Sequence, residues 1–168
     1  PWSDQRVAVA AALVLEPKVL LADEPVSMLD VSIRAEILNL LAELKQERGI
    51  SILFITHDLG TVAAVADRIA VMYLGRIVEI GSVQQVLRYP QHPYTKALLS
   101  VVPVPNPRLR RQRIVLQGET PDPTRLPPGC RFAPRCPLAQ TACREVDPQL
   151  RPPADDQGTA HQAACILV

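Results

Sequence analysis

The sequence predicts an α/β fold, with a parallel sheet flanked by helices and followed by an irregular extension rich in proline and cysteine. Two strand-length apolar runs, 19–22 and 52–55, are uninterrupted, which is typical of strands buried in a parallel sheet. The segment between them repeats apolar residues at helical spacing and predicts a helix. The extension is marked by composition, because 12 of the 17 prolines and all four cysteines lie in residues 103–168.

The individual elements are justified by local signals. Alanine content predicts the first helix, Gly49 suits the end of the long one, and Gly75 can turn two strands into a hairpin. In order, we expect a helix at 5–15, a strand at 18–23, a helix from 30 to 48, a strand at 51–56, a helix at 59–66, a hairpin at 68–81 and short helices at 82–88 and 93–101. The strand, helix and strand predict a right-handed βαβ unit. After Val102 the prolines argue against long regular elements.

Composition excludes several classes of protein. The formal net charge of +1 gives no reason to expect a nucleic-acid partner. The apolar runs are shorter than the about twenty residues that a membrane helix needs. No basic region precedes an apolar core at the N-terminus, so we expect no signal peptide and a cytoplasmic protein. The chain opens on Pro1 rather than methionine, and we expect a fragment of a longer protein.

Polar residues follow both predicted strands of the parallel sheet. Asp23 and Glu24 end the first, and Thr56, His57 and Asp58 end the second. Ligands of parallel α/β sheets sit beyond the carboxyl ends of the strands, so these side chains are candidates for a reaction site. An apolar strand followed by Asp-Glu is the Walker B pattern of nucleotide hydrolases, which bind Mg²⁺ with the nucleotide. The alternative is that the acids cap the next turn and that the histidine is a packed or solvated residue.

The order of the neighbouring motifs resembles the ATP-binding cassette (ABC) family. "DEPVSMLD" resembles Walker B and the D-loop, with Met28 where a smaller residue is usual, and "ITHD" resembles the switch-histidine motif. The resemblance implies a partial P-loop NTPase fold that uses ATP and Mg²⁺. By position it implies the following roles: Asp23 coordinates Mg²⁺, Glu24 is the general base, Asp30 is the D-loop acid that links the two sites of a dimer, and His57 contacts the γ-phosphate.

Residues 67–103 closely resemble the oligopeptide and dipeptide importers, and "HPYTKALL" is the most distinctive part. This resemblance implies that residues 1–81 are the C-terminal half of the ATPase core and that 82–168 are the family-specific extension. It implies an ATPase that powers import of di- or oligopeptides, or of nickel. The implied partners are a second ATPase subunit, transmembrane permease subunits and, indirectly, an extracytoplasmic substrate-binding protein, with the chain peripheral on the cytoplasmic face of the membrane.

A phosphate loop is missing from this sequence. No "GxxxxGK[ST]" occurs, and only 22 residues precede Asp23. We therefore expect the C-terminal half of a subunit, inactive by itself. Pro1 and Trp2 stand where the family's signature has glycines. An alternative is an inactive cassette remnant that acts as a metal-binding docking module; a helicase-like motor that shares only "DE" is a weaker one, because it leaves the cysteines unexplained.

Four cysteines in the extension form a candidate metal site: Cys130, Cys136, Cys143 and Cys165. In a cytoplasmic protein metal binding is favoured over disulfides. Zinc commonly uses closer C-x-x-C pairs, whereas separated thiolates suit an iron–sulfur cluster. Because similar tails in peptide importers are associated with such a cluster, we rank [4Fe–4S] first, zinc second and reduced thiols third. His161 is a candidate spare zinc ligand, and the alternative is that this histidine near the chain end is solvated.

Overall fold

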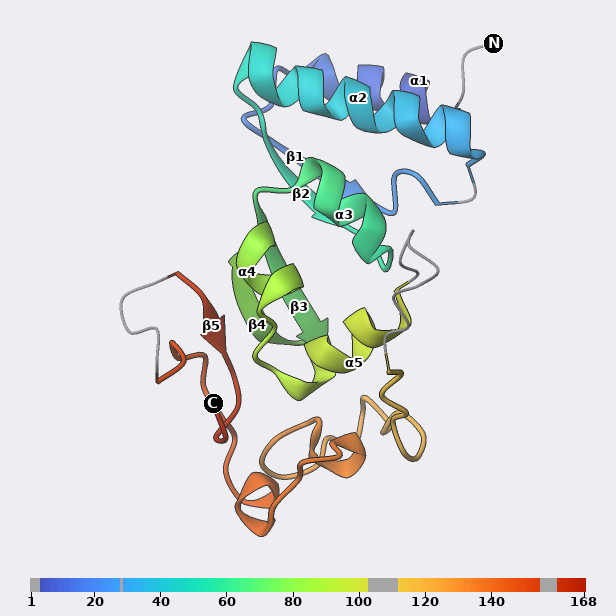
Figure 1. The fold of residues 1–168 in the computed structure, drawn as a ribbon. Helices are drawn as coiled ribbons and strands as arrows, with labels where there is room; N and C mark the ends of the chain where they lie inside the picture. The colour runs from blue at the N-terminus through green and yellow to red at the C-terminus, as the bar shows by residue number, and fades with distance from the viewer. Residues whose placement is uncertain (1–3, 28, 103–111, 155–159) are drawn as a thin grey trace. The chain divides into compact units, whose positions relative to one another are not determined.

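The computed structural model describes residues 4–27, 29–102, 112–154 and 160–168 (Figure 1). Pro1, Trp2 and Met28, which enter the comparison with the ABC motifs, lie outside these residues. The chain forms two compact units, which divide between Val65 and Ala66. The expected division after residue 81 falls within the second unit, at β4, and stays a prediction about the family's domains.

The first unit is a strand–helix–strand arrangement with two further helices. Its elements are α1 (Asp4–Leu13), β1 (Val19–Asp23), α2 (Val31–Arg48), β2 (Ser51–Ile55) and α3 (Leu59–Val65). β1 and β2 are parallel, with Val19 opposite Ser51 and Asp23 opposite Ile55. The predicted parallel pairing and connecting helix are therefore confirmed, and this register puts the residues after both strands at the same edge.

One face of α2 supplies the core of the first unit. Ile37, Leu41 and Leu44 recur at helical spacing, and all three are buried with Leu20 of β1. Complete burial of an aliphatic side chain such as that of Ile37 contributes roughly 1.5–3 kcal/mol. The helix ends at Gly49, whose left-handed φ of 63° is open to glycine.

The opposite face of the two-stranded sheet is apolar and exposed. Its side chains, with exposed fractions of 62%, 63%, 57% and 44%, are those of Val19, Leu21, Leu53 and Ile55. Parallel sheets are normally covered on both faces. This unit therefore presents an apolar surface of the kind that parallel sheets bury.

The second unit is built around an antiparallel hairpin, β3 (Arg68–Tyr73) and β4 (Arg76–Ser82). The two turn residues, Leu74 and Gly75, have φ values of 45° and 73°. Positive φ at both positions is typical of the two-residue turns that match strand twist. The predicted hairpin is confirmed.

Two short helices follow the hairpin, as predicted. α4 (Val83–Arg88) begins with a reciprocal capping box between Ser82 and Gln85. α5 (Pro93–Val101) is capped by Nδ1 of His92, which accepts from the amide of Tyr94. Proline is favoured at the first helical position, so "HP" in "HPYTKALL" is a helix start.

The described residues after 111 are largely irregular. They contain two short 3₁₀ turns, η1 (Ala133–Arg135) and η2 (Thr141–Arg144), and one two-residue strand, β5 (Gln162–Ala163), which lies beside β4 (Figure 1). Two residues of this region contact the hairpin turn. Nη1 of Arg131 donates to the carbonyl of Leu74 at 2.5 Å, and Asp147 forms an ion pair with Arg76. Among the described helices, none combines the length and apolar character needed to cross a membrane.

Candidate functional site

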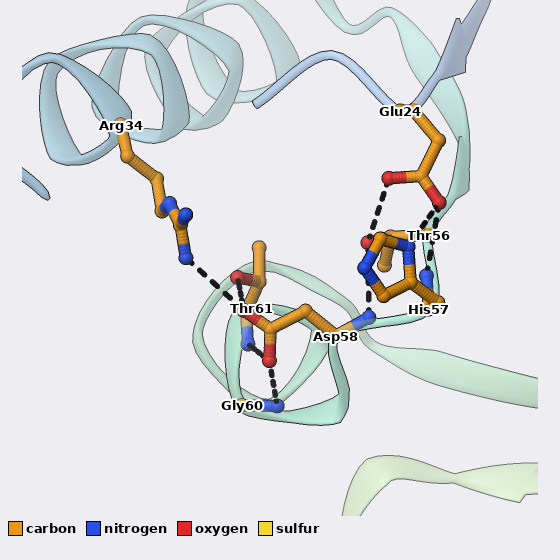
Figure 2. A network of polar contacts seen from close by, with 7 residues as sticks. All are labelled: Glu24, Arg34, Thr56, His57, Asp58, Gly60 and Thr61. Carbon is orange, nitrogen blue, oxygen red and sulfur yellow. Dashed lines mark hydrogen bonds and ion pairs between the residues drawn. The ribbon is translucent and has the colours of Figure 1, made fainter. Parts of the chain in front are cut away.

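Glu24 and His57 meet where the two parallel strands end. Oε1 of Glu24 accepts from the backbone amide of His57 at 3.1 Å and lies 2.7 Å from its Nδ1 (Figure 2). The His57 side chain is 83% exposed, whereas that of Glu24 is 35% exposed. The ring of His57 therefore contacts Glu24 through Nδ1, while most of the side chain stays open to solvent.

The backbone at Glu24 has an unusual conformation. Its φ is 46°, in the left-handed region that non-glycine residues adopt at a cost of about 1–2 kcal/mol. Its amide donates to the carbonyl of Ile55 at 2.9 Å, and its carbonyl accepts from the hydroxyl of Ser27 at 2.8 Å. These bonds offset the strain and direct the carboxylate toward His57 rather than toward the following turn. Within the described residues, the bonds of the Glu24 carboxylate go to His57 and Thr56 and not to the following turn.

Asp58 organises the loop after β2. Its carboxylate accepts from the Thr61 hydroxyl at 2.7 Å and the Gly60 amide at 2.9 Å, and lies 3.3 Å from Nη1 of Arg34 (Figure 2). The Thr61 hydroxyl, the amides of Gly60 and Thr61 and the Arg34 charge lower the pKa of Asp58, against the opposing effect of partial burial. Asp58 is thus an anion at neutral pH and starts α3.

The four cysteines line one cavity in the second unit, together with His92 and Phe132. All four are free thiols. Burial, and to a smaller extent neighbouring thiols, raises the pKa of Cys130, Cys136 and Cys165. Within the described part of the chain, however, no group of three or more His, Cys, Asp or Glu side chains is placed to hold a metal ion. The cysteines share a cavity without converging on one point.

A backbone hydrogen bond joins two of these cysteines, Cys130 and Cys143. The amide of Cys130 donates to the carbonyl of Cys143 at 2.9 Å. Gly129, with a φ of 71°, packs so tightly that a Cβ there would lie 2.6 Å from the carbonyl carbon of Arg144. A glycine at this crossing is what allows the two segments to touch.

Comparison with known proteins shows what each part of this chain is similar to. The model described as "Oligopeptide/dipeptide transporter, C-terminal region" matches residues 78–143. The model described as "AAA domain, putative AbiEii toxin, Type IV TA system" matches residues 4–63. The dipeptide transport ATP-binding protein DppF of Haemophilus influenzae is 54% identical over 90% of this chain and 46% of its own length. The oligopeptide transport ATP-binding protein OppF of Salmonella typhimurium is 47% identical over 98% of this chain and 48% of its own. The chain is homologous to the ATP-binding proteins of dipeptide and oligopeptide transport.

DppF of Escherichia coli is a third such relative, 53% identical over 88% of this chain and 44% of its own length. The chain thus spans about half the length of these transport ATP-binding proteins. Among solved structures, cbiO1 from Clostridium perfringens, part of the ABC transporter complex cbiONQ, is 41% identical over 52% of this chain and 36% of its own, with a TM-score of 0.49.

The other two acids of the predicted site lie close in sequence to Glu24. Asp23 is the last residue of β1 and Asp30 immediately precedes α2; both are exposed. Mg²⁺ usually keeps several waters and takes one or two carboxylates plus phosphate oxygens, so a single open carboxylate at the strand end, such as that of Asp23, fits this ion. Asp30 makes no side-chain cap on α2, which leaves its carboxylate open.

A buried network in the second unit escaped the sequence interpretation. Glu79 is fully buried, and its carboxylate accepts from the amides of Gln91 and His92 at 2.8 and 2.9 Å. Nε2 of His161 lies 2.8 Å from Oε1 of Glu79, and the side chain is buried, so the expectation that His161 is solvated is wrong. Its role as a zinc ligand stays a prediction. The available signal was a glutamate amid apolar residues in "RIVEIG".

Burial dominates the electrostatics of His92. It lowers the pKa of His92 from 6.5 to about 4, although the Glu79 charge acts in the opposite direction. The ring is therefore neutral at pH 7. Its Nδ1 is free to accept the Tyr94 amide at 3.1 Å and cap α5.

Proposed function

We propose that this chain is the C-terminal part of an ATP-hydrolysing subunit that powers import of di- or oligopeptides, with nickel as the alternative cargo. The relatives named for dipeptide and oligopeptide transport support the transport assignment. The single observation that carries the chemistry is the 2.7 Å contact between Glu24 and His57 at the ends of paired parallel strands.

Glu24 acts as general base in this proposal. Its Oε1 is oriented by two contacts to His57, and Oε2 lies 3.5 Å from the Thr56 hydroxyl, so the carboxylate is held in one orientation for the attacking water. His57 presents its exposed ring edge to the γ-phosphate. Asp23 would hold Mg²⁺, which supplies neutralisation of phosphate charge when bound.

The proposed partners follow from the same family. A second ATPase subunit would meet the segment around Asp30, whose carboxylate is open. Permease subunits and an extracytoplasmic substrate-binding protein would complete an importer, with this chain peripheral on the cytoplasmic face. Because this sequence contains no phosphate loop, this chain alone is expected to be inactive.

A [4Fe–4S] cluster at Cys130, Cys136, Cys143 and Cys165 is a second proposal, with zinc as the alternative metal. Its support is that all four thiols line one cavity and none is in a disulfide. A cluster held there would need these side chains to turn toward a common centre. Anaerobic purification with iron, sulfide and zinc analysis tests it: about four irons per chain are expected, and a metal-free protein would leave reduced thiols.

The ATPase proposal is tested with Glu24→Gln in a full-length subunit that carries this sequence. We expect kcat for ATP hydrolysis to fall by about 10²–10⁴-fold, the usual contribution of a general base. Glu47→Gln, at an exposed position of α2, is the matched control. Hydrolysis by Glu24→Gln at the wild-type rate would refute the role of Glu24, and a wild-type protein without ATPase activity would favour the inactive docking module.

A further inference from the structure

The guanidinium of Arg34 connects α2 to the loop that carries His57. Arg34 lies in the first turn of α2, where its amide donates to the carbonyl of Asp30 at 2.9 Å. Its Nη1 reaches Oδ2 of Asp58 at 3.3 Å, as Figure 2 shows. The segment that starts at Asp30 and the loop after β2 thereby share an ion pair.

Asp58 is in turn linked to Glu24 through Thr56. The amide of Asp58 donates to the Thr56 hydroxyl oxygen at 3.1 Å, and that hydroxyl lies 3.5 Å from Oε2 of Glu24. An unbroken series of polar contacts therefore runs from Arg34 to Glu24, visible in Figure 2. The last contact is long, so the coupling it carries is modest.

The position of the Arg34 side chain is specific. Two other partners of Asp58, Gly60 and Thr61, follow it closely in the sequence. Arg34 comes from a different element, α2. Nε of Arg34 is buried without a hydrogen-bond partner in the described part of the chain. A freely solvated arginine would not withdraw this group from water, so the side chain is held in place by its surroundings.

We propose that Arg34 is a positioning residue for ATP hydrolysis. It holds Asp58, and through Thr56 and the adjacent His57 the carboxylate of Glu24, in register with the segment that starts at Asp30. The inference rests on the proposed ATPase function. Within one subunit, Arg34 would thereby connect the segment that starts at Asp30, proposed to meet the second subunit, to the proposed general base Glu24.

The first test is a kinetic comparison of Arg34→Met, Arg34→Lys and Arg48→Met in the full-length subunit. Arg34→Met is expected to lower kcat about two- to fivefold, the range open to a half-exposed ion pair, with the KM for ATP unchanged. Arg34→Lys should restore most of kcat because it keeps the charge. Arg48→Met, at the exposed far end of α2, should match wild type.

A double variant examines the route through Asp58. If Arg34 acts through that carboxylate, adding Arg34→Met to Asp58→Asn should lower kcat no further than Asp58→Asn alone. Additive losses would overturn the inference. Equal effects of Arg34→Met and Arg34→Lys would also overturn it, because loss of packing rather than charge would then be responsible.

Hydrogen exchange provides a readout that does not need activity. In the same proteins, the amides of Gly60 and Thr61 should exchange faster in Arg34→Met than in wild type or Arg48→Met, since the loop loses its tie to α2. Unchanged exchange would overturn the inference. A wild-type protein that hydrolyses no ATP would refute the proposed function instead, and faster exchange in Arg34→Met would then still show that Arg34 holds the loop after β2.

Discussion

Glu79 and His161 are 82 positions apart in the sequence, yet their side chains meet at 2.8 Å with almost no exposure to solvent. The same carboxylate accepts the amides of Gln91 and His92. One buried group thus joins β4, the start of α5 and the segment that leads to Cys165. Because a buried carboxylate is stable only with such partners, this network is expected to control the stability of the second unit.

Glu79→Gln tests that expectation. The amide nitrogen of glutamine would face backbone donors or the histidine ring, so the free energy of unfolding should fall by about 1–3 kcal/mol. Urea unfolding measures the change, and faster reaction of the four thiols with a thiol reagent should accompany it, since His92 and Cys165 line the same cavity. Glu119→Gln, at an exposed site, should change neither quantity. Equal behaviour of the two variants would contradict the role of Glu79.

The neutral state of buried His92 predicts a pH dependence. Its pKa is about 4 in the folded protein and 6.5 ordinarily, so the unfolded chain binds more protons between these values. The contribution of His92 to stability is complete above pH 6.5 and decreases by about 3 kcal/mol as the pH falls to 4. Urea unfolding at intervals between pH 4 and 7.5 measures the slope.

His92→Asn is the matched variant for this pH experiment. Asparagine can still cap α5 through its side-chain oxygen but does not titrate, so the slope between pH 4 and 6.5 should flatten. An unchanged slope in His92→Asn would show that other groups cause the pH dependence.

Gly129 and Gly118 separate two costs of replacing a glycine. Both have positive φ, 71° and 68°, but a Cβ at 129 would meet backbone atoms of Arg144 whereas one at 118 would meet nothing within 4 Å. Gly118→Ala should therefore lose about 1 kcal/mol from the backbone alone. Gly129→Ala should lose several times more and raise the reactivity of Cys130 and Cys143. Thermal unfolding of both variants measures the two losses of stability. Equal losses would contradict the close approach of Gly129 to the backbone of Arg144.

The apolar face of β1 and β2 predicts dye binding by this chain. A solvatochromic apolar dye should fluoresce with the wild type and bind more weakly to Leu53→Lys, because Leu53 is 57% exposed on that face. The substitution should change the free energy of unfolding by no more than about 0.5 kcal/mol. Val115→Lys, 80% exposed in an irregular segment, is the control and should leave dye binding unchanged.

Local patterns predicted most of the elements, and long-range contacts account for what was missed. The spacing of Ile37, Leu41 and Leu44 is visible in the sequence, and so is the glycine of the hairpin turn. β5 has two residues and exists through its pairing with β4, so no local pattern marks it. Glu79 gave only a weak signal, because its partners are far along the chain.

The same distinction applies to the candidate site. Parallel strands bring their carboxyl ends to one edge, so the meeting of Glu24 and His57 follows from motif order. The contact of Arg34 with Asp58 depends on how α2 is rotated against a loop, which residue spacing does not specify. For the cysteines, the sequence shows only that all four lie in the extension, and the structure adds that they line one cavity. Metal binding stays a prediction.

Two contacts connect the hairpin turn to the segment that contains the cysteines. Arg131 binds the Leu74 carbonyl from one side of the cysteine segment, and Asp147 holds Arg76 from the other. The two-residue turn is thus held at Leu74 and at Arg76 by residues that are far along the chain. The tip of β3 and β4 is therefore attached at Arg131 and at Asp147, the two positions that flank the stretch containing Cys136 and Cys143.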